Sequence, residues 1–206
     1  MLKRTKGRLL LTLLVITGLA GTLKDTSLSH KERKSAMNLM KSTRMDVLKN
    51  VKGLSTNQLN FKTTGNWSIK DCIYHIASSE KNLWAIIETS LKKQSNPEKR
   101  SEIKITDEEL IKMVEDKNFK ISTVEVFVPK NISYKSLNSA VNAFRSRRSE
   151  HINYIKLTTE DLRNHVVQMP FGLIDCYQVC LMAASLTNRY SQQIDEIKTD
   201  PNFPKK

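Results

Sequence analysis

The stretch that decides the fold is NWSIKDCIYHIASSEKNLW, residues 66–84. Ser68, followed three residues later by Asp71, forms a capping box, so we expect a helix to begin at Ser68 with Trp67 before it as a hydrophobic staple. The apolar residues that follow recur every three or four positions, which predicts an amphipathic helix with one face in a core. His75 lies on this helix and is the first candidate for a functional side chain.

Three further segments show the same helical spacing of apolar residues. They cover residues 31–52, residues 134–156, and a stretch that follows a loop around Met169–Gly172 and continues to Lys198. Four long amphipathic helices predict an all-α fold, a four-helix bundle with one long crossover between its second and third long helices.

The crossover contains its own local signals. Residues 96–102 are predicted to form a loop, and Thr106 with Glu109 forms a second capping box that begins a short helix. Residues 121–128 alternate like a strand, but no second convincing strand is present to pair with them. We therefore expect them to form an extended segment that lies on the bundle.

A basic block and a short apolar run mark residues 1–20 as a targeting segment. The run, residues 9–20, is shorter than the roughly 20 apolar residues of a membrane-spanning helix, and its small residues suit cleavage. We expect a signal peptide and an exported protein, periplasmic or secreted; an uncleaved membrane anchor is the alternative. The remaining chain divides into a linker (21–30), a bundle domain (31–198) and a C-terminal tail (199–206).

Charge and cysteine content limit the classes of partner. The formal net charge is +13, and removal of residues 1–20 with their four cations leaves +9. These cations are scattered among acids without interleaved aromatic residues, so we expect no specific nucleic-acid partner; weak contact with a membrane surface or another polyanion is left open. Cys72, Cys176 and Cys180 have apolar neighbours typical of core residues, although a bridge from Cys72 to one of the others is left open.

The last predicted helix carries Leu186 and Tyr190 four residues apart on one face, followed by a Gln-Ile pair. Together with the Trp-Ser-x-x-Asp-x-x-x-His pattern that ends at His75, this helix resembles the DinB-like (damage-inducible protein B) superfamily. Members of that family bind a divalent metal through three histidines, one at the end of the first pattern and a His-x-x-x-His pair on the last helix. The resemblance implies a DinB-like four-helix bundle over roughly residues 31–198. It also implies that His75 keeps the first ligand position, whereas Leu186 and Tyr190 occupy the other two.

Leucine offers no lone pair, and a neutral tyrosine is a poor ligand for zinc, nickel or iron(II) compared with imidazole. We therefore expect a degenerate metal site, no cofactor, and direct packing of Leu186 and Tyr190 in the core. The hydroxyl of Tyr190 needs a partner, for which the imidazole of His75 is the candidate. His75, Tyr190 and His151, which falls on the apolar face of the third helix, are candidates for lining a ligand pocket.

An active enzyme is the alternative. A rearranged set of His75 and His151 with a carboxylate from Asp71 or Glu80 would hold a divalent metal, as in the thiol S-transferases or hydrolases that the resemblance implies. Glu80 and Arg148 each interrupt an apolar stripe, so we expect them to meet in a buried structural pair. The preferred hypothesis is an exported, non-catalytic or small-ligand-binding DinB-like protein, and its oligomeric state, including a homodimer, is left open.

Overall fold

The computed structural model describes residues 27–62, 67–118 and 134–205. The elements are α1 (His30–Val51), α2 (Thr56–Asn60), α3 (Ile69–Leu91), the 3-10 helix η1 (Pro97–Glu102), α4 (Asp107–Glu115), α5 (Leu137–Leu157), the 3-10 helix η4 (Leu162–Asn164), β1 (Val166–Met169), β2 (Gly172–Asp175) and α6 (Cys176–Lys198).

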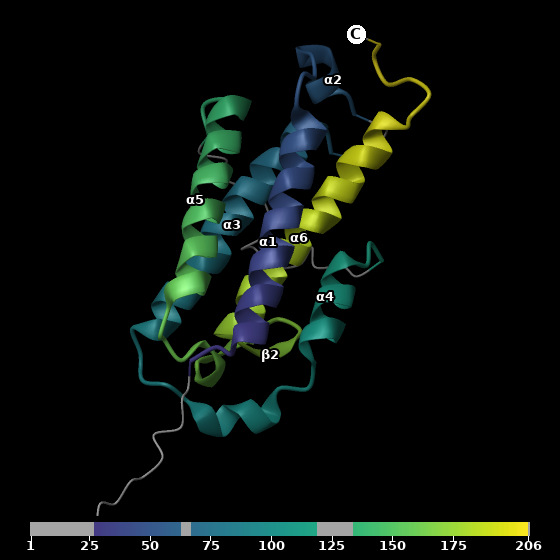
Figure 1. Ribbon diagram of the computed structural model, residues 1–206. Helices are drawn as coiled ribbons and strands as arrows, with labels where there is room; N and C mark the ends of the chain where they lie inside the picture. The colour runs from purple at the N-terminus through teal and green to yellow at the C-terminus, as the bar shows by residue number, and fades with distance from the viewer. Residues whose placement is uncertain (1–26, 63–66, 119–133, 206) are drawn as a thin grey trace, which may run out of the picture.

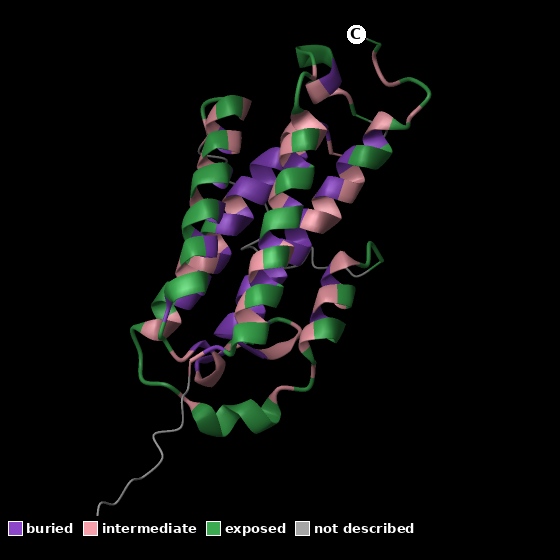
Figure 2. Cartoon of the chain, viewed as in Figure 1, coloured by how far each residue is buried: buried purple, intermediate pink, exposed green. Residues whose placement is uncertain are grey.

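The four long helices α1, α3, α5 and α6 form a bundle, as predicted (Figure 1). α1 packs against α5 and α6, and α3 packs against the same two helices, so the four enclose a common core. The short helix α4 lies against the outer side of α6 and covers it from solvent. This explains why the first half of α6 is buried on all sides, from Cys176 to Thr187, whereas α1 and α5 keep an exposed face (Figure 2).

Polar caps fix where the helices begin. Ser68 accepts a hydrogen bond from the backbone N–H of Asp71, and the Asp71 carboxylate accepts one from the backbone N–H of Ser68 at 3.0 Å. Thr106 and Glu109 form the same reciprocal pair at α4. Both capping boxes were predicted from the sequence, and each satisfies backbone groups that would otherwise lack a partner at a helix end.

The loop expected around Met169–Gly172 is instead a β-hairpin. Val166 to Met169 pair in antiparallel register with Gly172 to Asp175, so the connection is only two residues long. Gly172 has a φ of +132°, a conformation that side chains disfavour. The sequence analysis missed both strands because each is only four residues long, too short to show a period-two pattern.

Several other boundaries differ from the predictions. The 3-10 helix η1 replaces the loop expected at residues 96–102, and the short helix α2 was not foreseen. α5 begins at Leu137 rather than Tyr134, because Ser136 caps it by accepting from the backbone N–H of Ser139. The targeting segment and the alternating residues 121–128 lie outside the described residues. Among the described helices, none is long and apolar enough to cross a membrane.

Candidate functional site

His75 lies in the second turn of α3, where an aromatic cluster surrounds it. Only 2% of His75 is exposed. Its ring centroid lies 4.9 Å from that of Trp67 and 4.4 Å from that of Tyr190, and the Trp67 and Tyr190 rings stack on each other with centroids 5.4 Å apart. We call Trp67, His75 and Tyr190 the aromatic cluster. α6 supplies Tyr190, so the cluster joins the beginning of α3 to the second half of α6.

The polar contact of His75 is local. Its Nε2 lies 3.2 Å from the hydroxyl oxygen of Ser79, one turn further along α3. The imidazole of His75, the expected partner of the Tyr190 hydroxyl, meets the Tyr190 ring at a tilt of 52°, and Ser79 occupies its Nε2.

Burial keeps both titratable members of the aromatic cluster uncharged at neutral pH. Desolvation, together with the nearby positive charge of Arg189, lowers the pKa of His75 to about 4. Desolvation raises the pKa of Tyr190 to about 12. The neutral imidazole and the neutral phenol therefore pack as aromatic side chains.

Leu186, the remaining position implied by the family resemblance, is 2% exposed and belongs to the apolar core. Because it precedes Tyr190 by four residues on α6, it lies on the same side of that helix. The structure thus places a leucine and a tyrosine at the two positions where the resemblance implies histidines, and the tyrosine reaches His75 as expected.

Glu80, Arg148 and His151 form a second cluster, which we call the buried charge cluster. Arg148 donates to Glu80 through two bonds, from Nε to Oε1 at 2.8 Å and from Nη2 to Oε2 at 2.5 Å. Nδ1 of His151 donates to Glu80 Oε1 at 2.6 Å, and the ring of His151 stacks on Trp84 with centroids 3.6 Å apart. Burial alone would raise the pKa of Glu80, but Arg148 and His151 outweigh it and lower the pKa to about 2.

The remaining donors of Arg148 are also used. It donates to the hydroxyl of Thr43 at 3.1 Å, the hydroxyl of Thr187 at 2.9 Å and the carbonyl of Ala183 at 3.2 Å. These contacts link α5 to α1 and α6 as well as to α3. They cross the bundle between two apolar clusters, one containing Met40 and the other Val47. The buried charge cluster therefore fixes the relative register of all four long helices.

Comparison with known proteins now identifies the family. The family model of the DinB superfamily matches residues 39–185. The chain belongs to the DinB superfamily. The matched region includes His75 and ends one residue before Leu186.

A solved structure supports the DinB-like fold. YfiT from Bacillus subtilis, described as a probable metal-dependent hydrolase with an unusual four-helix bundle topology, superposes with a TM-score of 0.59 at 14% sequence identity. The match covers 86% of this chain and 92% of that chain. A comparison with curated proteins gave no match.

The donor set of this DinB-like chain does not fit the three-histidine metal site that the resemblance implies. Leu186 has no donor atom, Tyr190 presents a neutral ring, and Nε2 of His75 is engaged by Ser79. In the part of the chain that the structure describes, no three His, Cys, Asp or Glu side chains gather closely enough to hold a metal ion.

The rearranged ligand set considered from the sequence is not brought together either. Both oxygens of Glu80 are bound by Arg148, and one of them also by His151. Asp71 is engaged at the beginning of α3 by Ser68 at 2.8 Å, and an ion pair with Lys62 at 2.7 Å holds the same oxygen. Each carboxylate is therefore already neutralised by a cation.

The cysteines are free thiols and all three are buried. Cys72 packs in the same apolar cluster as Ile69, whereas Cys176 and Cys180 pack in the other. The bridge left open from the sequence is absent, and the prediction of small core residues describes them correctly.

Sequence reasoning missed the two tryptophans as parts of the clusters. Trp67 was expected to act as a hydrophobic staple, but its ring covers His75 and stacks on Tyr190. The ring of Trp84 stacks on the ring of His151 in the buried charge cluster. The contact between Ser79 and Nε2 of His75 could have been predicted from their spacing of four residues, since side chains at this spacing meet on a helix surface.

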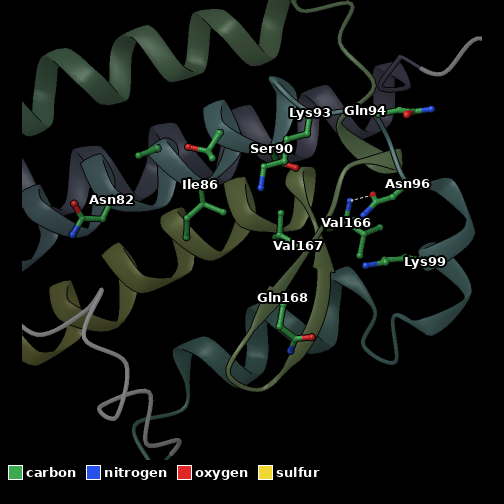
Figure 3. Close-up of a pocket in the computed structure, with 12 residues that line it drawn as sticks. Asn82, Ile86, Ser90, Lys93, Gln94, Asn96, Lys99, Val166, Val167 and Gln168 are labelled. Atoms are coloured by element: carbon green, nitrogen blue, oxygen red, sulfur yellow. Dashed lines mark hydrogen bonds between the residues drawn. The ribbon is translucent and has the colours of Figure 1, made fainter.

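A groove of about 710 Å³ is lined by residues that belong to neither cluster (Figure 3). It runs along the second half of α3 and continues to η1 and β1. Its lining consists of Asn82, Ala85, Ile86, Thr89, Ser90, Lys93, Gln94, Asn96, Lys99, Val166, Val167 and Gln168. None of the sequence-predicted site residues lines this groove.

Proposed function

We propose that this DinB-like protein is a non-catalytic relative that binds a small ligand and does not use the three-histidine metal site. The observation that carries the proposal is the aromatic cluster: His75, the retained ligand position, is enclosed by Trp67 and Tyr190 and bonded to Ser79. An imidazole that binds a metal must present a free nitrogen lone pair to it. Here the nitrogen that faces away from the backbone has a hydroxyl partner instead.

Ligand binding is supported by the groove beside β1. Its volume of about 710 Å³ falls within the range of pockets that accept small organic molecules. The groove combines apolar residues such as Ile86 and Val167 with amides and two lysines, the mixture that orients a ligand by a few polar contacts. The alternative, a divalent-metal hydrolase or thiol S-transferase, requires donors that the two clusters do not offer.

Metal analysis of the purified protein tests this proposal. We expect less than stoichiometric zinc, nickel or iron, and no rise in melting temperature when these ions are added, because only a ligand that binds the folded state stabilises it. The His75→Ala variant should give the same metal content as the parent. Stoichiometric metal in the parent that is lost in His75→Ala would replace the proposal with the enzyme alternative.

We further propose that the protein is exported. The support is the sequence of residues 1–20, in which four cations precede a short apolar run. Mass spectrometry of the protein from its native host should find a chain that begins near Gly21. An intact Met1 on a protein from the soluble cytoplasmic fraction would contradict export.

A further inference from the structure

The groove beside β1 has a defined distribution of charge. Lys93 follows the end of α3, and Lys99 lies on η1, so two lysines from different elements line one groove (Figure 3). No acidic residue lines the groove. Within residues 27–62, 67–118 and 134–205, neither lysine forms an ion pair with an acidic side chain. The groove therefore attracts an anion.

The walls of the groove are held together by hydrogen bonds. The Asn96 side chain bonds to both backbone polar groups of Val166, accepting from its N–H at 2.7 Å and donating to its carbonyl at 3.0 Å. The backbone N–H of Asn96 also donates to the carbonyl of Asn164 at 2.8 Å, and His165 Nδ1 donates to the carbonyl of Ser90 at 3.0 Å. α3, η1 and β1 are thus tied together, so the groove is formed before a ligand arrives.

The edge of β1 that faces away from β2 contributes backbone polar groups to the groove. Asn96 takes the place of a neighbouring strand at Val166, which shows that the N–H and carbonyl of Val166 point away from β2. Because these groups alternate along a strand, those of Gln168, two residues on, point to the same outer edge. No described residue bonds to the backbone N–H or carbonyl of Gln168 at this edge.

An apolar shelf completes the groove. Ile86 and Val167 are partly buried and pack against the core, and Ala85 and Val166 extend the surface that they form. This combination of an apolar shelf, an open backbone edge and two cations matches a ligand with an apolar tail, an amide and an acid group.

We propose that the groove binds a small organic acid of the N-acyl amino acid class. Lys93 and Lys99 hold the carboxylate, the backbone of Gln168 bonds the amide, and the acyl tail lies on Ile86 and Val167. This inference rests on the proposed ligand-binding function and names the site and the chemical class of its ligand.

Calorimetric titration with N-octanoylglycine tests the site. The parent should bind it, and the double variant Lys93→Gln, Lys99→Gln should bind it about tenfold more weakly, since two charge contacts are lost. The matched control Lys92→Gln, Lys104→Gln removes two lysines that do not line the groove and should bind like the parent. Octanoate, which lacks the amide, and N-octanoylglycinamide, which lacks the charge, should both bind more weakly than N-octanoylglycine.

Absence of binding by the parent would overturn the inference, as would equal affinity of the two double variants. Equal binding of N-octanoylglycine and either analogue would do the same. The titration is repeated with and without EDTA, so that its result stays separate from the metal analysis. If the parent is metal-free but does not bind N-octanoylglycine, only the assignment of the groove is refuted. If the parent carries stoichiometric metal and its binding of N-octanoylglycine is insensitive to EDTA, only the loss of the metal site is refuted.

Discussion

Breaking the pair of Glu80 and Arg148 should destabilise the protein more than any surface change. Arg148 is fully buried and Glu80 is 2% exposed, so removing either partner leaves an uncompensated charge inside the bundle. Glu80→Gln or Arg148→Met should each lower the free energy of unfolding by about 3–5 kcal/mol. The double variant should lose less than the sum of the two, with a coupling energy of about 1–3 kcal/mol, because the pair then disappears together.

Urea denaturation followed by far-UV circular dichroism measures these differences. The matched control is Arg145→Met, which removes an exposed arginine one turn earlier on α5 and should change stability by less than about 0.5 kcal/mol. The double variant also removes the bonds from Arg148 to Thr187 and to the Ala183 carbonyl, so it should remain less stable than the parent. Single variants as stable as the control, or strictly additive effects, would refute the role assigned to the buried charge cluster.

Three further changes have expected outcomes. Because the pKa of His75 falls to about 4 on folding from an ordinary value of 6.5, the unfolded chain binds the proton more readily, and stability should drop by up to about 3 kcal/mol from pH 7 to pH 4. His75→Phe should remove this part of the drop in urea melts across that range, and an unchanged pH profile would contradict the assignment. Arg163 bonds three carboxylates and stacks on Tyr177, so Arg163→Met should cost about 2–3 kcal/mol by thermal denaturation, and a loss below 0.5 kcal/mol would argue against it. Thiol titration should detect no reactive cysteine in the native protein and three after denaturation; fewer than three would indicate a bridge.

The bundle could be predicted from the sequence because its signals are local and repeated. The capping boxes at Ser68 and Thr106 and the apolar spacing of four long segments need no tertiary information. The hairpin before α6 was missed because its strands pair over only four residues each and are stabilised by contacts such as that of Asn96 with Val166, which lies 70 residues away. Such a contact leaves no periodic trace in the sequence.

The candidate site was predictable only in part for the same reason. The spacing of Leu186 and Tyr190 placed them on one helix face, and the family resemblance implied that His75 lies opposite them; the structure brings the rings of His75 and Tyr190 together. The interrupted apolar stripes led to Glu80 and Arg148 as a pair, and the structure places them in a bidentate contact. The orientation of the Trp67 ring, which contacts both His75 and Tyr190, could not be predicted because tertiary packing alone determines it.

The central claim is that packing has taken the place of a metal, and restoring the ligands tests it most directly. The variant Leu186→His, Tyr190→His places two imidazoles one turn apart beside His75, which completes three nitrogen donors. Zinc content by elemental analysis should rise from far below stoichiometric in the parent to about one ion per chain in the variant. The rise should be abolished when His75→Ala is added. A parent that already carries about one ion per chain, or a variant that stays as metal-poor as the parent, would contradict the account.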